Sequence, residues 1–317
     1  MAFLKKCDTT FGVCENVSFE IGCSRCAGMQ KEGSLMSTAM EIITSRQNQS
    51  VSFVCKLSNK KYRDAEGKFR IDGIKLFKEA VWSKVELESV FVRQSALDKI
   101  MPIVEKTLSD LRCVKVVSDG VFEKMSEEKS PDGIICVAKY IDNLHKIIKI
   151  NNREDLITCL PDLFTKKIFA LESVRDPGNI GTVIRTAAAF GVECLLISND
   201  CADIYNPRTV RAAMGALFRQ RIIRVNSIPN AIEVLRSEGK KVYAAVLGEN
   251  SRLLGRDTPG ETDCIVVGNE GHGLSDETVA ACDGSILIPM MPGAESLNAA
   301  VASSICMWDQ FGRTDVR

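Results

Sequence analysis

Three loops in the second half of the chain carry the polar residues best suited to chemistry. Their sequences are Glu-Ser-Val-Arg-Asp-Pro-Gly-Asn-Ile-Gly-Thr-Val-Ile-Arg at 172–185, Gly-Asn-Glu-Gly-His-Gly-Leu-Ser at 268–275 and Ile-Pro-Met-Met-Pro-Gly-Ala-Glu-Ser-Leu-Asn at 288–298. Each loop follows a short apolar segment with the pattern of a buried strand. A parallel sheet binds its ligand at the carboxyl ends of its strands. We therefore expect the binding site at these three loops.

The two usual nucleotide-binding motifs are absent. No G-x-G-x-x-G sextet follows the first strand-like segment, and no G-x-x-x-x-G-K-[ST] loop occurs. The glycines at 268, 271 and 273 would let the backbone approach a flat ligand closely. The same spacing also fits an ordinary turn between a strand and a helix, and spacing alone leaves both interpretations open.

The elements that must position these loops alternate between strand-like and helix-like patterns. From residue 166 onward this alternation predicts an α/β domain whose parallel sheet is covered on both faces. A smaller α/β domain is expected over 36–142, and a less regular connector over 143–165. The first 35 residues lack this periodicity and are predicted to be a disordered or untranslated extension.

Composition limits the kinds of partner and of catalysis. The 41 basic and 41 acidic residues cancel, so a nucleic acid would have to be held by local patches. The chain has only two histidines, His145 and His272, which argues against histidine metal sites and most Ser–His or Cys–His catalysis. No apolar run approaches the ~18 residues that a membrane span needs. We therefore expect no membrane partner and no metal cofactor.

Cysteine usage indicates a reducing compartment. The chain has 13 cysteines, and those from Cys55 onward stand singly in mostly apolar segments, where a thiol behaves as a small hydrophobe. The odd total and the lack of a signal-peptide pattern favour the cytoplasm. The four cysteines near the start (Cys7, Cys14, Cys23 and Cys26) could instead form a small zinc-binding appendage. The zinc appendage is the rival hypothesis: the prediction is that translation starts at Met36, in which case the appendage is not made.

The three loops, taken together, resemble the three motifs of the SpoU/TrmH methyltransferases, the 2′-O-ribose RNA methyltransferases of the SPOUT superfamily. Order, spacing and identity match from 166 to the end of the chain. The basic stretch at 44–73 is similar, more loosely, to the start of a ribosomal-protein-like α/β domain that binds substrate in this family. The resemblance implies S-adenosylmethionine as cofactor, a deep trefoil knot at the C-terminal helix, and a homodimer.

The resemblance also assigns roles residue by residue. It places five residues in catalysis: Asn179, Arg185, Glu270, Ser296 and Asn298. It places six at the cofactor: Gly248, Gly268, Asn269, Ile288, Met290 and Leu297. His272 lies inside the second motif at a position that varies in the family.

The chemistry of methyl transfer agrees with these residue types. A ribose 2′-hydroxyl must lose its proton as it attacks, so a nearby cation should stabilise the developing alkoxide. An arginine is almost always protonated, and Arg185 is therefore expected to be such a stabiliser; acting as the base would require a strongly lowered pKa. Glu270 could orient Arg185 or Asn179, or it could simply be a carboxylate at a helix N-terminus.

Two basic groups are candidates for binding RNA. They are Lys56, Lys60, Lys61 and Arg63 in the first domain, and Arg208 with Arg211 in the second. Helical spacing puts Arg208 and Arg211 on one face, which suits phosphates. The alternative is a solvated or dimer-facing surface. Trp308 and Phe311 are expected in the core or in a dimer interface.

The leading prediction is an enzyme that methylates a ribose of ribosomal or transfer RNA. An alternative is a non-catalytic SPOUT-like RNA-binding protein, although every polar group of the three motifs is present. A small-molecule dehydrogenase is disfavoured by the missing dinucleotide motif.

Overall fold

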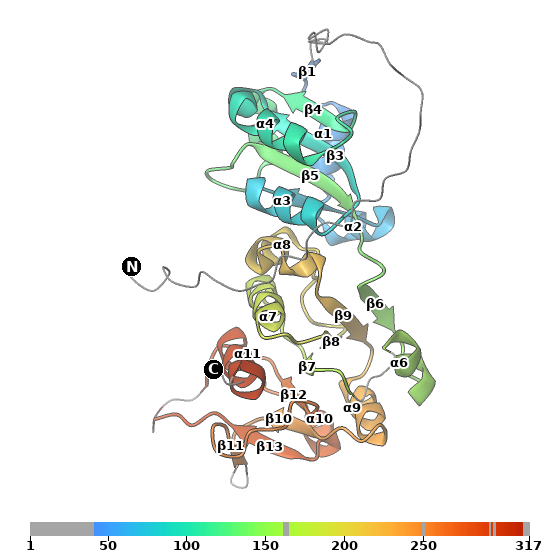
Figure 1. The fold of residues 1–317 in the computed structure, drawn as a ribbon, viewed down its shortest axis with the longest axis vertical. Helices are drawn as coiled ribbons and strands as arrows, with labels where there is room; N and C mark the ends of the chain where they lie inside the picture. Colours follow the sequence, from blue (N-terminus) through green and yellow to red (C-terminus); the bar gives the residue numbers. More distant parts are fainter. Residues whose placement is uncertain (1–40, 161–164, 249–250, 292, 294–295, 313–317) are drawn as a thin grey trace, which may run out of the picture. The chain divides into compact units, whose positions relative to one another are not determined.

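The structure is a computed structural model that describes residues 41–160, 165–248, 251–291, 293 and 296–312. All of them belong to one compact unit, Met40–Arg317 (Figure 1). Across these ranges no helix is long and apolar enough to cross a membrane. The same ranges contain no cluster of His, Cys, Asp and Glu side chains that could hold a metal ion. The early cysteines and Met36 lie outside the described residues.

The first half of the unit contains a five-stranded mixed sheet in the order β1-β4-β3-β5-β2. Strand β5 runs antiparallel to both of its neighbours, whereas β3, β4 and β1 are mutually parallel. The strands are β1 (Ile42–Ile43), β2 (Lys68–Asp72), β3 (Leu87–Arg93), β4 (Val114–Val117) and β5 (Ile134–Lys139). The helices are α1 (Gln49–Lys56), α2 (Lys60–Glu66), α3 (Ile74–Trp82), α4 (Leu97–Thr107) and α5 (Asp119–Met125).

The basic stretch in this half folds as two short helices, α1 and α2. Asn48 and Asn59 cap them by accepting hydrogen bonds from the first-turn backbone amides of Ser50 and Lys61. Gly67 then ends α2 in a left-handed conformation. Hydrophobic periodicity does not indicate these helices, because short helices are specified more by their caps than by a repeating apolar pattern.

The second half is built on an eight-stranded sheet in the order β11-β13-β10-β12-β7-β8-β9-β6, and all its pairings are parallel. This confirms the predicted parallel sheet. Its strands are β6 (His145–Ile148), β7 (Ile168–Leu171), β8 (Cys194–Ser198), β9 (Arg221–Val225), β10 (Val242–Ala245), β11 (Arg252–Leu253), β12 (Cys264–Val267) and β13 (Gly284–Leu287). Its helices are α6 (Arg153–Cys159), α7 (Pro177–Ala189), α8 (Pro207–Ala213), α9 (Ile228–Ser237), α10 (Asp276–Ala281) and α11 (Ala299–Met307).

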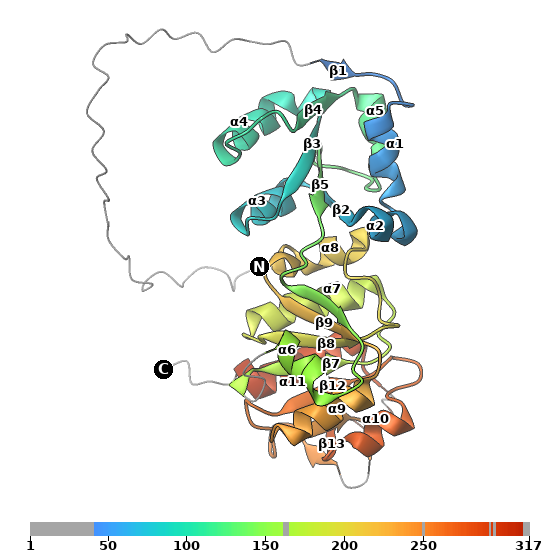
Figure 2. The same ribbon diagram turned by 90° about the vertical axis from the view of Figure 1, so that its right-hand side faces the viewer.

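Helices cover both faces of this sheet, as Figures 1 and 2 show. Alternate strand residues point to opposite faces: Phe169 packs in the cluster with α7, α8 and α11, whereas Ala170 packs in the cluster with α6 and α9. The strands are therefore apolar throughout, as expected for a sheet buried on both sides.

The segment expected as an irregular connector contains regular structure, and local conformation sets two helix ends. Part of the expected connector at 143–165 forms β6, which pairs with β9 at the edge of the sheet, and α6, which has a capping box at Asn152. Helix α8 ends at Ala213, because Met214 and Gly215 both take positive φ angles, 51° and 90°. Helix α11 begins at Ala299, because the Asn298 side chain accepts from the amides of the first turn.

Nine cysteines lie in the described residues, and all are free thiols. Five are buried: Cys136, Cys194, Cys201, Cys264 and Cys306. Burial raises the pKa of Cys194 and Cys306 to about 12. These side chains fill space as small apolar groups, in agreement with the sequence interpretation.

Candidate active site

A cavity of about 490 Å³ lies at the carboxyl ends of β10, β12 and β13. Its walls combine apolar side chains from these strand ends, such as Val267 and Ile286, with residues of the second and third predicted loops. The volume is in the range of small-molecule sites, which are mostly apolar with a few polar groups. The sheet edge predicted to bind a ligand is therefore hollowed.

The second loop is a tight turn that forms one wall of the cavity. The backbones of Asn269 and Gly273 exchange hydrogen bonds of 3.0 and 2.9 Å. A Cβ atom at Gly268 would lie 2.4 Å from the carbonyl carbon of Gly273, so a side chain at 268 would force the turn open. Gly268 is thus required by close backbone packing.

One residue from each loop joins a hydrogen-bonded cluster beside the cavity. The Asn179 amide, in the first turn of α7, donates to the Glu270 carboxylate. The Asn298 amide donates to the Asn179 carbonyl oxygen at 3.1 Å. The side-chain oxygen of Asn298 also caps α11. The Asp176 carboxylate caps α7 by accepting a hydrogen bond from the backbone N–H of Asn179 at 2.9 Å. Two helix caps therefore hold the cluster in place.

The other two predicted catalytic residues form no hydrogen bond with this cluster in the described part of the chain. Ser296 lines the cavity and is exposed. Arg185 is exposed on α7 and forms no ion pair with any residue that the structure describes. Its guanidinium therefore remains accessible to a partner from outside the chain.

The six predicted cofactor residues fall mostly on the cavity wall. Five line it: Gly268, Asn269, Ile288, Met290 and Leu297. Gly248 directly follows Leu247, which lines the cavity, but does not line it itself. Asn269 also has a structural role: its amide donates to the Ser173 carbonyl at 2.8 Å, and its oxygen accepts from the amide nitrogen of Gly271 at 2.8 Å.

S-adenosylmethionine is the cofactor that the motifs imply, and the cavity fits it. Gly268 and Gly273 line the cavity with backbone alone, and Ile288 and Leu297 add apolar side chains to its wall. A planar base could lie between such surfaces, with backbone groups of the loops available to its polar edge. The Glu270 carboxylate, on the same wall, could attract a cationic sulfonium.

Glu172, which is not among the predicted site residues, anchors the second loop. It is the first residue after β7 and is only 9% exposed. Its carboxylate accepts hydrogen bonds from the Ser275 amide nitrogen at 2.9 Å, the Ser275 hydroxyl at 3.0 Å and the Thr278 hydroxyl at 2.6 Å. An acidic residue directly after a buried strand was the available signal.

The structure contradicts the RNA-binding prediction for Arg63. Its side chain is 1% exposed; it donates to Asp203 at 2.6 Å and to the carbonyls of Leu57 and Ser58 at 2.7 and 2.8 Å. A guanidinium held in this way cannot reach phosphates. Its charge stabilises the fold, and sequence could not show this because Asp203 is 140 positions away.

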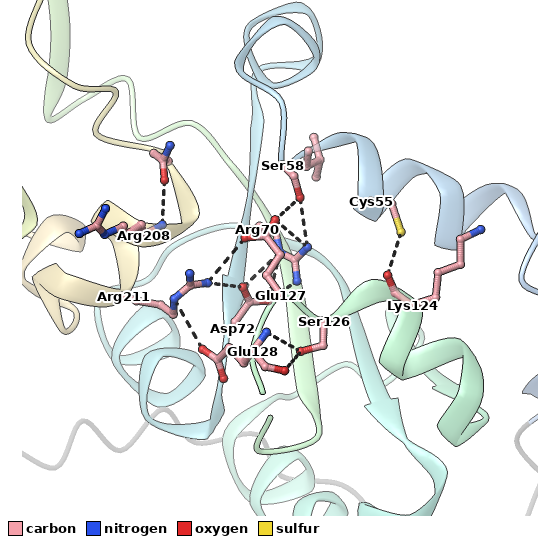
Figure 3. A network of polar contacts seen from close by, with 12 residues as sticks. Cys55, Ser58, Arg70, Asp72, Lys124, Ser126, Glu127, Glu128, Arg208 and Arg211 are labelled. Carbon is pink, nitrogen blue, oxygen red and sulfur yellow. Dashed lines mark hydrogen bonds and ion pairs between the residues drawn. The ribbon is translucent and has the colours of Figure 1, made fainter. Parts of the chain in front are cut away.

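Arg211 also turns away from the predicted surface. Figure 3 shows it directed at an acidic group of the first half, where Nη1 lies 3.4 Å from Asp72 and Nε lies 3.7 Å from Glu128. Burial, and then the nearby Asp72 carboxylate, raise the pKa of Glu128. Arg70 shares Asp72 at 2.7 Å and is itself 1% exposed. Arg211 is therefore committed to a partly buried ionic network.

The remaining predicted RNA-binding residues are exposed. Arg208 is 64% exposed and pairs with Asp176 at 3.1 Å, while Lys60 pairs with Asp64 in the next turn of α2. Lys56 and Lys61 are exposed and have no acidic partner among the described residues. Two of the six candidates are thus left as exposed cations without an acidic partner.

His272 and the aromatic residues near the end of the chain have simple positions. His272 is exposed in the second loop, at the edge of the cavity. Phe311 is buried in the core, as one of the two expected environments requires. Trp308 is 49% exposed and lies seven residues after Val301, which is 47% exposed. Helix α11 and its continuation therefore present apolar surface outward.

Two family models match the chain. The SpoU rRNA methylase family model covers residues 166–308, and a model of the MRM3-like substrate-binding domain covers residues 48–136. The two matches fall on the larger and the smaller sheet respectively.

Individual relatives agree with these matches. The chain is 30% identical to the 23S rRNA (guanosine(2553)-2′-O)-methyltransferase RlmP of Bacillus subtilis, over 86% of this chain and 100% of that protein. It is 28% identical to the 23S rRNA (uridine(2479)-2′-O)-methyltransferase of Streptomyces viridochromogenes, over 84% of this chain and 90% of the other. The crystal structure of an AdoMet-bound rRNA methyltransferase from Sinorhizobium meliloti superposes with a TM-score of 0.69 at 26% identity, covering 85% and 96% of the two chains.

Proposed function

Because this chain belongs to the SpoU rRNA methylase family, whose members methylate RNA at the ribose 2′-oxygen with S-adenosylmethionine, we propose that the Asn179–Glu270–Asn298 cluster is its methyl-transfer site. The observation that carries the proposal is the meeting of three distant loops in one hydrogen-bonded cluster at the cofactor-sized cavity. Positioning is the main requirement for an in-line transfer without a covalent intermediate.

The cluster fixes both ends of one amide. The Asn179 side chain donates to Glu270 and accepts from Asn298, so its plane and rotamer are determined before any substrate binds. When bound, S-adenosylmethionine supplies an electrophilic methyl group on a sulfonium. Glu270 and Ser296 line the wall where a ribose would have to lie, and their oxygens suit ribose hydroxyls.

Arg185 is proposed to act on the substrate oxygen. Its exposed guanidinium can approach an RNA ribose from α7 and stabilise the alkoxide as the 2′-hydroxyl loses its proton. Since no described carboxylate neutralises it, its full charge is available to the substrate.

The proposed substrate is ribosomal RNA, with transfer RNA as the other candidate. Support comes from the family model and from the named ribosomal RNA sites of the two relatives. Incubation with methyl-labelled S-adenosylmethionine and either RNA should give alkali-resistant 2′-O-methyl dinucleotides from ribosomal RNA. Label found only in transfer RNA would show that transfer RNA, and not ribosomal RNA, is the substrate. Cofactor binding without any label in RNA would favour the non-catalytic alternative.

A homodimer with a knotted C-terminus completes the proposal. The exposed Val301 and Trp308 offer an apolar stripe that a second copy would cover. The chain leaves β12 for β13, beyond β10, and returns to pack α11 against α7, a path compatible with a trefoil knot. Sedimentation should give a dimer, and Trp308→Asp should give monomers; a monomeric native protein would refute the dimer.

We also propose the domain roles that the sequence suggested. Residues 36–142 would bind RNA, 166–317 would hold the methyltransferase, and 143–165 would connect them even though β6 and α6 join the larger sheet. The cytoplasm remains the proposed compartment, in keeping with the reduced thiols of the described cysteines.

A further inference from the structure

Helix α3 turns a basic and aromatic face outward. Lys75, Lys78 and Trp82 follow one another at spacings of three and four residues, so they lie on one side of the helix. All three are exposed, and the Trp82 side chain is 72% exposed, against 49% for Trp308. The opposite side of α3 is buried through Leu76 and Phe77. Burial therefore explains the inner face of the helix but not the indole on its outer face.

Trp82 is paired with an arginine from the other half of the unit. The Arg219 guanidinium carbon lies 5.2 Å from the centre of the indole ring, a cation–π distance. Arg219 also donates to Glu79 at 2.7 Å. Gly215 makes this approach possible, because a Cβ atom there would lie 2.7 Å from the Glu79 side chain. The indole thus stands where α3 meets the segment after α8.

Lys84 adds a third lysine just after the helix. It is exposed and has a φ of 56°, in the left-handed region where glycine is favoured at helix ends. The turn is otherwise regular, since the Val85 amide donates to the Ala80 carbonyl at 2.9 Å. The backbone would accept glycine more easily, so the local conformation does not account for a lysine here.

The charges of this face are not neutralised within the described part of the chain. Lys75, Lys78 and Lys84 form no ion pair with any described residue. Two carboxylates close to these lysines in the sequence are already engaged, Glu79 with Arg219 and Glu86 with Lys139. The face therefore suits a polyanion that also offers flat groups, which is the chemistry of single-stranded RNA.

We propose that Lys75, Lys78, Trp82, Lys84 and Arg219, together called the α3 surface, bind an unpaired segment of the RNA substrate. One base stacks on the free face of Trp82, and the lysines contact the phosphates on either side of it. The inference rests on the proposed function, because it takes RNA as the substrate. The α3 surface takes the RNA-binding role predicted for Arg63 and Arg211, which form ion pairs with Asp203 and Asp72 instead.

Stacking can be tested by fluorescence and affinity. In a Trp308→Phe background Trp82 is the only tryptophan, and its emission should be quenched by a short oligouridylate. Trp82→Ala should weaken binding of ribosomal RNA about tenfold, whereas Trp82→Phe should keep most of the affinity. In methyl transfer Trp82→Ala should raise KM for RNA and leave kcat and S-adenosylmethionine affinity unchanged.

The phosphate contacts can be tested through salt dependence. Lys75→Ala combined with Lys78→Ala should lower the slope of log K against log salt by about 1.4, or about 0.7 per contact on a single strand. Lys84→Gly removes the charge while suiting the backbone, so it should lower the slope by about 0.7 without loss of stability. Lys99→Ala with Lys106→Ala on α4 is the matched control and should leave the slope unchanged.

Three results would overturn the inference. One is an active enzyme whose RNA affinity and salt slope are the same in wild type and in the α3-surface variants. Another is an equal loss in the α4 control. The third is a change of oligomeric state in Trp82→Ala with RNA binding intact, which would assign the surface to a second copy of the chain. If wild type itself neither binds nor methylates RNA, the proposed function fails first.

Discussion

Arg211, on helix α8, lies 3.4 Å from Asp72, the last residue of strand β2, and so joins the two sheets through a buried carboxylate (Figure 3). Asp72 is 8% exposed and is shared with Arg70. Removing one partner from a buried ion pair is costly, because it leaves the other charge without compensation. Ionic contacts, as well as apolar ones, therefore help to fix the relative position of the two sheets.

This contact should be measurable as a coupling energy. A double-mutant cycle of Arg211→Ala and Asp72→Asn, followed by urea unfolding, should give about 1 kcal/mol of interaction between the two sites. The pair Asp110 and Arg112, which is exposed, serves as the comparison and should give a weaker coupling, because solvent screens the two charges. Additive effects of the two changes would show that the Arg211 contact contributes nothing to stability.

Arg63 should behave as a structural residue. Arg63→Ala leaves Asp203 and the carbonyls of Leu57 and Ser58 without their donor, so it should lower the free energy of unfolding by about 3 kcal/mol. Lys61→Ala, an exposed neighbour on α2, should change it by less than about 0.5 kcal/mol. Chemical denaturation of both variants decides the matter. Equal stabilities would show that the buried contacts of Arg63 add nothing to the stability of the fold.

Arg185 should matter for turnover and not for cofactor binding. Arg185→Ala should lower kcat by roughly 10²–10³, because a donor that stabilises developing charge is lost. S-adenosylmethionine affinity, measured by calorimetry, should stay close to wild type, since Arg185 does not line the cavity. Arg256→Ala, at an exposed loop position, is the control and should keep full activity. A variant at 185 with more than half the wild-type rate would refute the role.

Glu172 should hold the cofactor wall in place. Glu172→Gln replaces one accepting oxygen by a donor that faces hydroxyl and amide hydrogens, so it should destabilise the fold by about 2 kcal/mol. It should also weaken S-adenosylmethionine binding, because the loop that it anchors carries Gly268 and Glu270. Glu277→Gln, exposed on α10, controls for the charge alone. Unchanged cofactor affinity in Glu172→Gln would limit the residue to a stabilising role.

His145 should make stability depend on pH in the mildly acidic range. Burial lowers the pKa of His145 from 6.5 to about 4, and its ring contacts the Tyr205 hydroxyl at 2.6 Å. Between these pH values the unfolded chain binds a proton that the folded chain excludes, so stability rises with pH across this window and is fully present above about 6.5. The total effect is about 3 kcal/mol.

Thermal unfolding of wild type and His145→Gln at pH 5 and pH 7.5 tests this. The wild type should lose stability at pH 5, and the variant should lose much less. The second histidine, His272, is exposed, so His272→Gln should keep the wild-type pH dependence. A variant at 145 that still follows the wild-type curve would show that another group titrates there.

Much of the fold followed from local pattern. The apolar spacing over 74–82, with Leu76, Phe77 and Ala80 on one side, predicts a helix, and α3 has these bounds. The three loops came together as expected, since the carboxyl ends of parallel strands share one edge of a sheet. The hydrophobic period of an element and the spacing of loops along the chain are local properties, so they can be recognised directly in the sequence.

The residues that sequence assigned poorly depend on distant partners. The sequence suggests surface cations at Arg63 and Arg211. In the structure Asp203 lies beside Arg63, and Asp72 lies beside Arg211. Glu172 was overlooked for the same reason, because Ser275 and Thr278 lie about a hundred positions away. When the group that neutralises a charged side chain is distant along the chain, the local sequence predicts that the side chain is exposed to solvent.

Chemical labelling of the buried thiols can report when parts of the fold open locally. Cys194 and Cys306 stay protonated at neutral pH and out of contact with solvent, so alkylating reagents can reach them only when the sheet or α11 separates from its neighbours. Each modified cysteine would report a different breathing motion, since these two thiols sit in different packed clusters. Labelling followed by mass mapping could thus rank the parts of the molecule by how often they open.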